Sequence, residues 1–177
     1  TFYNLALDKK DNIITSGIYN AGADFGMNSD TLVLGSYSRH TINSNRSAKD
    51  DMFIAKYDSA GNVSWAYGAG SRQYEYLTSL TTDEEGSIYA SGHTSGNGNF
   101  NIYYFDVDPI GPGKRNSFAG DVGIILKVDS NGVYNWMQDF NYYNNSIGRN
   151  FKPDYHDIQV DVEGNVILGG AIYSDVN

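Results

Sequence analysis

Acidic and amide side chains recur at alternate positions in the sequence, which is a pattern that can bind a hard cation. Residues 161–165 read Asp-Val-Glu-Gly-Asn, residues 83–87 read Asp-Glu-Glu-Gly-Ser, and residues 8–12 read Asp-Lys-Lys-Asp-Asn. Calcium loops use oxygen ligands at such spacing, but Lys10 puts an ammonium group at the middle position, and no copy has the Glu that an EF-hand carries at its twelfth position. We therefore interpret these segments as backbone turns, and a calcium loop is the alternative.

Asp106 and Asp108 form a better metal candidate. They are separated by one residue in an irregular segment that ends at Pro109, and neighbouring carboxylates can share a hard cation. Calcium is the cofactor that this pair would bind, and the sequence indicates no other cofactor.

The histidines His40, His93 and His156 are the candidate general bases. None stands in a recognised spacing to a nucleophile. The chain has no Cys, which excludes a cysteine nucleophile, a disulfide framework and a thiolate zinc site. We interpret the histidines as polar loop residues and predict no catalytic residue.

Two aromatic clusters are candidates for ligand binding. Tyr103 and Tyr104 form one, with Phe105 beside them, and Tyr142 and Tyr143 form the other. Tyrosine rings can stack on the apolar face of a sugar while their hydroxyl groups form hydrogen bonds. Packing of long loops onto the fold is the alternative, and we favour it.

Charge and composition narrow the function classes. The chain of 177 residues has 12 Lys and Arg against 21 Asp and Glu, a formal net charge of −9. This opposes nucleic-acid binding, which depends on clusters of basic residues. No stretch approaches the roughly 18 apolar residues of a transmembrane helix. Turn-forming residues are frequent, with 20 Gly, 19 Asn, 17 Asp and 17 Ser, but an aromatic content of 14% argues against disorder.

Internal repeats supply the elements that must position these groups. Residues 8–17, 83–92 and 161–170 align without gaps, at spacings of 75 and 78 residues. Residues 56–65 align with residues 127–136 at a spacing of 71. Two independent motifs with nearly the same period indicate a repeat of about 70 residues. The same alignment places His156 opposite Tyr3 and Thr78, and His93 opposite Ile18 and Ala171.

Each motif has the features of a β-hairpin, because alternating apolar residues flank a turn with Asp first and Gly fourth. Asp11 replaces the Gly in the first copy, and Asp tolerates a positive φ. Two hairpins in each repeat make four strands. We expect those of the middle copy at residues 77–82, 87–91, 122–128 and 133–138. Long excursions, at residues 18–49 and 93–120, separate the second and third strands, and no segment has a sustained helical period.

Trp65 and Trp136 each stand four residues past a turn Gly, so we expect them to fill equivalent positions between neighbouring sheets. Lys56 and Lys127 also occupy one equivalent position. We expect their stems to be packed and their ammonium groups to lie near the acidic turns.

Residues 51–65 have the form Asp-x-Phe-Ile-x-Lys-x-Asp-x-x-Gly-Asn-x-x-Trp, and this block resembles the repeat of bacterial SBBP-type (seven-bladed) β-propeller proteins. The second copy departs from it, with Gly123 and Ile124 at the aromatic pair position and Val133 after Gly132. Residues 105–109 also look like a loop motif of large secreted Bacteroidota surface proteins. The resemblance implies a β-propeller fold and export, in many members by the type IX secretion route.

These observations predict an all-β fold, namely a β-propeller segment with four-stranded antiparallel blades, of which about two and a third are present. The repeats would span approximately residues 1–71, 72–143 and 144–177, with the last incomplete, and we expect the sequence to be an excerpt of a longer chain.

The expected function is that of a secreted or cell-surface module of a Gram-negative bacterium that binds or supports other molecules without catalysis. The alternative is a polysaccharide-processing enzyme with its site at the propeller centre. Expected partners are other protein chains, the remaining blades of the same chain, or glycans. Nucleic acid and direct membrane insertion are not expected.

Overall fold

The computed structural model describes residues 1–19, 23–24, 33–34, 51–70, 74–95, 103–106, 115–118, 122–140, 142–144 and 149–174. All regular structure in these ranges is β-strand, so the predicted all-β class is confirmed. The strands are β1 (Phe2–Leu7), β2 (Ile13–Tyr19), β3 (Ala23–Asp24), β4 (Val33–Leu34), β5 (Asp51–Tyr57), β6 (Val63–Ala69), β7 (Tyr74–Thr82), β8 (Ile88–Ser95), β9 (Tyr103–Asp106), β10 (Arg115–Phe118), β11 (Val122–Val128), β12 (Tyr134–Phe140), β13 (Tyr142–Asn144), β14 (Arg149–Val160) and β15 (Val166–Ser174). No helix that could cross a membrane occurs in these ranges.

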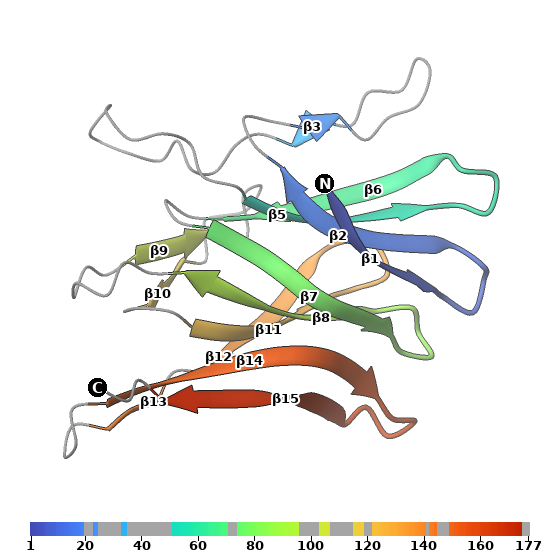
Figure 1. Ribbon diagram of the computed structural model, residues 1–177. Coiled ribbons are helices and arrows are strands. Elements are labelled where there is room, and N and C mark those ends of the chain that lie inside the picture. The colour runs from blue at the N-terminus through green and yellow to red at the C-terminus, as the bar shows by residue number, and fades with distance from the viewer. Residues whose placement is uncertain are drawn as a thin grey trace.

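Three antiparallel sheets follow one another along the chain. The first sheet has the order β1-β2-β5-β6, the second β7-β8-β11-β12, and the third β13-β14-β15. Figure 1 shows them stacked in this sequence from the top of the view to the bottom. Two small sheets, β3 with β4 and β9 with β10, lie in the segments that join the second and third strands of the larger sheets.

The predicted hairpins are present. In the middle repeat β11 has the predicted bounds, and β7, β8 and β12 begin or end a few residues from them. The small strands β3, β4, β9 and β10 were not predicted, because they are short and interrupt segments rich in turn-forming residues.

The five hairpin turns share one geometry. At each turn the fourth residue has a positive φ: 58° at Asp11, 87° at Gly61, 80° at Gly86, 81° at Gly132 and 83° at Gly164. The leading Asp caps its own turn: in the last copy the Asp161 Oδ1 accepts the backbone N–H groups of Glu163 and Asn165, at 2.9 and 2.8 Å. The carboxylate therefore satisfies backbone donors that the turn leaves without a partner, which is the known role of Asp at turns.

The main core lies between the first and second sheets. Side chains from one face of each sheet meet there, including Ile14, Met52 and Ile54 from the first and Ile124 and Leu126 from the second, all fully buried. A smaller core joins the opposite face of the second sheet to the third sheet. The second sheet is therefore covered on both faces, and it supports the side chains described below.

Candidate functional site

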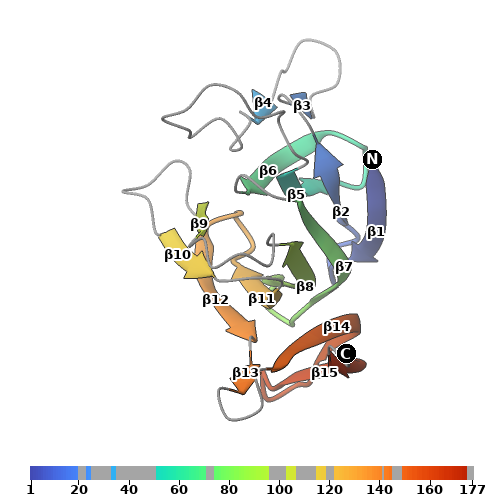
Figure 2. The same ribbon diagram turned by 60° about the vertical axis from the view of Figure 1, so that its left-hand side comes forward.

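The first long strand of each large sheet lies at the same side of the molecule. Figure 2 shows β1, β7 and β14 following one another at this side. The amide of Asn4 donates to the backbone carbonyl of Leu77 at 3.0 Å, and the hydroxyl of Ser79 donates to the Asp157 carboxylate at 3.1 Å. We call β1, β7 and β14 the inner strands.

Each inner strand contains a β-bulge at the same place in the repeat. The pairing register shifts between Phe2 and Asn4 in β1, between Leu77 and Ser79 in β7, and between Tyr155 and Asp157 in β14. The extra residues are therefore Tyr3, Thr78 and His156, which are the three positions that the sequence alignment placed opposite one another. Bulges turn a side chain out of the regular alternation, and they are frequent next to binding sites.

The three bulged residues line one pocket of about 740 Å³, which we call the inner-strand pocket. The complete lining consists of Tyr3, Asn4, Ile18, Tyr74, Glu75, Tyr76, Leu77, Thr78 and His156. Its volume is within the usual range for small-molecule sites.

Exposed aromatic rings surround this pocket. Tyr3, Tyr74 and Tyr76 are 54%, 46% and 37% exposed. The ring of Tyr76 lies 5.2 Å from the His93 imidazole, between ring centres. Glu75, which stands between Tyr74 and Tyr76 in β7 and also lines the pocket, is fully buried. Apolar ring faces beside hydroxyl, amide and imidazole groups form a lining that can stack on a flat apolar surface and also form hydrogen bonds.

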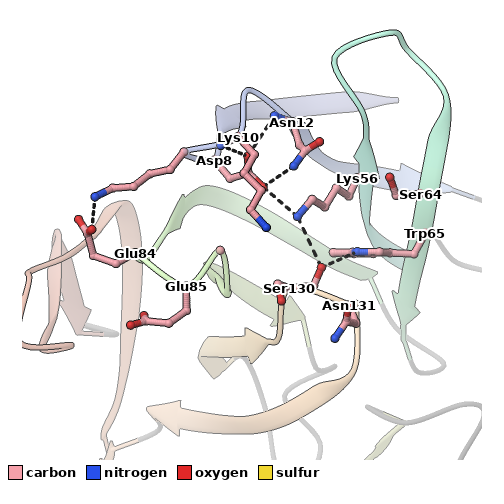
Figure 3. A pocket seen from close by; sticks show the side chains of 12 residues that line it. Asp8, Lys10, Asn12, Lys56, Ser64, Trp65, Glu84, Glu85, Ser130 and Asn131 are labelled. Atoms are coloured by element: carbon pink, nitrogen blue, oxygen red, sulfur yellow. Dashed lines mark hydrogen bonds and ion pairs between the residues drawn. The ribbon is translucent and has the colours of Figure 1, made fainter.

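A second pocket, of about 480 Å³, lies at the turns of the first and second sheets, and Figure 3 shows its lining. Its side chains are paired with one another within the first sheet and across to the second. The Lys56 Nζ lies 2.8 Å from the Asp8 Oδ2 of the same sheet, and the Trp65 Nε1 donates to the backbone carbonyl of Ser130, in a turn of the second sheet, at 3.0 Å. Lys9 forms an ion pair with Glu84 at the exposed rim. The contacts of Trp65 and Lys9 join the two sheets, so we interpret this pocket as a structural seam.

The hydrogen bonds that Asp8 accepts at this seam determine its ionisation state. Burial alone would raise its pKa, but hydrogen bonds from Asn12, Lys56 and Lys10 outweigh burial and hold the pKa far below its ordinary value. Asp8 is therefore a carboxylate that the folded protein holds in its charged form.

The second sheet repeats this arrangement. The Lys127 Nζ lies 3.4 Å from the Asp83 Oδ2 and donates to the Tyr89 hydroxyl at 2.5 Å. Burial would raise the pKa of Asp83, but hydrogen bonds from Ser87 and Tyr89 and the charge of Lys127 lower it overall. The prediction that Lys56 and Lys127 place their ammonium groups near the acidic turns is confirmed.

The predicted calcium alternative has no support from the turn geometry, because the Asp carboxylates already accept hydrogen bonds from their own turns. No group of three His, Asp or Glu side chains that could hold a metal occurs in the part of the chain that the structure describes. The candidate Asp108 lies outside that part, and only the backbone of Asp106, in β9, is described.

The structure describes the backbone of the four aromatic candidates but not their side chains. Tyr103 and Tyr104 lie in β9, and Tyr142 and Tyr143 lie in β13. Their side chains are outside the described residues, so their binding role stays a prediction.

The interpretation of the histidines as loop residues is wrong for two of them. His93 lies in β8, where it pairs with Gly123, and His156 is the bulged residue of β14. His93 is held in a strand because β8 extends to Ser95, beyond its predicted end at residue 91, and His156 lies within β14, which begins at Arg149. His40 lies outside the described residues.

No protein-family model matches the chain, and no curated protein matches it significantly. The functional interpretation therefore depends on the geometry above. Sequence reasoning missed the inner-strand pocket, although the alternation Tyr74-Glu75-Tyr76 and the alignment of Tyr3, Thr78 and His156 were the available signals.

Proposed function

We propose that the three large sheets are consecutive blades of a β-propeller and that the protein is a non-enzymatic binding module. Its ligand site is the inner-strand pocket. The observation that carries this proposal is the convergence of three equivalent bulges, at Tyr3, Thr78 and His156, on one pocket. In a propeller the first strand of each blade borders the central opening, and a site there draws side chains from several blades.

The lining favours a carbohydrate ligand. Tyr3, Tyr74 and Tyr76 present exposed rings to the pocket, and Asn4, Thr78 and His156 supply groups that form hydrogen bonds. A pyranose has an apolar face and a polar rim, which fits such a lining. A net charge of −9 favours a neutral glycan over an acidic one. Presentation at the surface of a Gram-negative bacterium fits this ligand class and belongs to the same proposal.

The test is a screen of neutral oligosaccharides against the protein, followed by calorimetry on any that bind. Tyr3→Ala and Tyr74→Ala should each weaken binding by about tenfold, the equivalent of about 1.4 kcal/mol. Tyr173→Ala is the matched control, because Tyr173 is 56% exposed on β15 and does not line the pocket.

The same samples distinguish binding from catalysis. Release of reducing ends from a bound oligosaccharide would favour the alternative, a polysaccharide-processing enzyme with its site at the propeller centre. Equal loss of affinity in Tyr3→Ala and Tyr173→Ala would show that the pocket is not the binding site.

A further inference from the structure

Within the described residues, the third sheet has no counterpart of the hairpins β5–β6 and β11–β12 that complete the other two sheets. In the first sheet β2 pairs with β5, and in the second sheet β8 pairs with β11. Their equivalent in the third sheet is β15, which stands at the edge of its sheet, with β14 as its one strand partner among the described residues. The backbone groups along the other side of β15 are therefore available to a further strand.

Among the described residues, Asp161 has no counterpart of the lysine that pairs with each of its two equivalents. Asp8 pairs with Lys56 and Asp83 pairs with Lys127, and each lysine is on the third strand of its sheet. Asp161 caps its turn in the same way, but no lysine forms an ion pair with it within the described ranges. The hydrogen bond from the Asn165 side chain, with others from its turn, lowers the pKa of Asp161, so its charge is present at neutral pH.

Trp136 is more exposed than Trp65, although its ring meets that of Tyr89 edge-on, with the ring centres 6.1 Å apart. The turn at residues 129–133 lies over Trp65, and a Cβ atom on Gly132 would stand 2.7 Å from the indole ring. Downstream of Trp65 on the same strand, Tyr67 and Ala69 are 6% and 0% exposed. Trp136 and Phe140, which correspond to Trp65 and Ala69, are 37% and 36% exposed. In a third sheet built like the second, the corresponding hairpin would lie over Trp136.

We propose that the free edge of β15, Asp161 and Trp136 together form a docking site for a β-hairpin with the sequence pattern Lys-x-Asp-x-x-Gly. The first strand of that hairpin pairs with β15, and its lysine reaches the Asp161 carboxylate. Its turn lies on the Trp136 ring, where only Gly leaves room, and a turn carbonyl accepts the Trp136 indole N–H. Each of these contacts has an observed counterpart around Lys56, Trp65 and Gly132.

The occupant comes from a polypeptide segment other than residues 1–177. The sequence contains the pattern Lys-x-Asp-x-x-Gly twice, at residues 56–61 and 127–132. Both copies already belong to complete sheets, where β5 pairs with β2 and β11 pairs with β8. The inference deepens the proposed function, since it rests on the interpretation of the sheets as successive blades, but it does not depend on the inner-strand pocket or on a glycan.

The experiment uses the intact protein labelled with ¹⁵N and an unlabelled peptide of residues 122–140 as the probe. The two Trp residues give two indole N–H signals, which Trp136→Phe assigns. Titration with the peptide should shift the Trp136 signal until binding is saturated and should leave the Trp65 signal in place. No shift, or an equal shift of both signals, would overturn the proposal, because an equal shift means displacement of the protein's own hairpin.

Matched variants test each contact. Trp136→Ala should weaken peptide binding by about thirtyfold or more, as expected for an aromatic anchor. Asp161→Asn should weaken binding of the native peptide by about threefold and leave a Lys127→Met peptide unaffected. A Gly132→Val peptide should not bind; binding as tight as that of the native peptide would contradict the proposed fit over the ring.

A short hairpin is marginally stable by itself, so a fused copy provides a second measurement. The protein is extended by a flexible linker of about 30 residues, comparable to the natural excursions, and a copy of residues 122–140. We expect the fusion to raise the melting temperature and to protect Trp136 from quenching by acrylamide, and the same fusion with Gly132→Val in the added copy to do neither. If the native fusion gives no protection, the docking site is refuted, whether or not the inner-strand pocket binds a glycan.

Discussion

Substitution of Gly132 by Ala tests the seam that joins the first and second sheets. Gly132 has a φ of 81°, and an added Cβ would stand 2.7 Å from the Cδ2 and Cε3 atoms of Trp65. Gly164 is the matched control, because its φ is 83° in a turn of the same geometry and an added Cβ would meet nothing within 4 Å. The two substitutions share the backbone cost and differ in the contact with Trp65.

The expected loss of unfolding free energy in Gly132→Ala is the sum of the backbone cost and the cost of the contact with Trp65. A left-handed conformation costs a residue with a Cβ about 1–2 kcal/mol, which is the whole effect expected for Gly164→Ala. Overpacking of a well-filled contact costs about 1–3 kcal/mol. Trp65 cannot withdraw freely, since its Nε1 is hydrogen-bonded to the Ser130 carbonyl. Gly132→Ala should therefore lose about 2–5 kcal/mol in total. At about 2–4 °C per kcal/mol for a chain of this size, it should melt about 2–12 °C below Gly164→Ala.

The assay is urea unfolding of both variants and the parent protein, followed by circular dichroism and by Trp fluorescence. A double-mutant cycle adds a direct check: Trp65→Phe removes part of the ring that the new Cβ would meet, so Gly132→Ala should cost less in that background. Equal losses of unfolding free energy in Gly132→Ala and Gly164→Ala, with no coupling to Trp65, would refute the interpretation of the turn as part of a packed seam.

Two further predictions concern the charges of the same seam. Lys56→Met should lower the free energy of unfolding by about 3 kcal/mol, since it leaves the buried Asp8 carboxylate without its ion partner. Lys9→Met should lower it by no more than about 1 kcal/mol, because the side chains of Lys9 and Glu84 are 63% and 53% exposed. Equal losses of unfolding free energy in the two variants, measured by urea unfolding, would contradict this prediction. The pKa of Asp8 is depressed in the folded state, so its contribution to stability is complete above the unfolded-state pKa of about 3.9 and is lost as the pH falls through the folded-state pKa. The difference in unfolding free energy between the parent protein and Asp8→Asn should therefore shrink below about pH 4, and a constant difference would exclude this role.

The hairpins could be predicted from the sequence because their determinants are local. An Asp followed three residues later by Gly specifies a turn in which the carboxylate caps nearby backbone N–H groups and the fourth residue has a positive φ. The exception, Asp11, was also predicted to adopt a positive φ, and its φ is 58°. The equivalence of Lys56 and Lys127 could also be read from spacing, because each lies two residues before such an Asp.

The inner-strand pocket could not be predicted in the same way. A bulge is a property of two strands together, since it appears only when the partner's register is known. The sequence placed Tyr3, Thr78 and His156 at one repeat position but gave no sign that each is the extra residue in its strand. The short strands β9 and β10 were missed for a related reason, because four residues among many turn formers carry too little periodicity to be recognised.

The seam shows why a turn motif and a docking surface are different properties of one sequence. Gly132, between β11 and β12, and Gly164, between β14 and β15, occupy turns of the same type and have nearly the same φ, yet one lies against an indole ring and the other faces open space. The turn therefore requires Gly for its backbone, and the seam requires it a second time for its lack of a side chain. That second requirement arises from Trp65, which lies 67 positions earlier in the chain. Conversely, a Trp at the repeat position of Trp65 predicts that a turn of the following sheet, with Gly as its fourth residue, lies on the indole ring. Trp136 stands at this position with 37% of its surface exposed, and this exposure is the reason why the proposed docking site is placed on it.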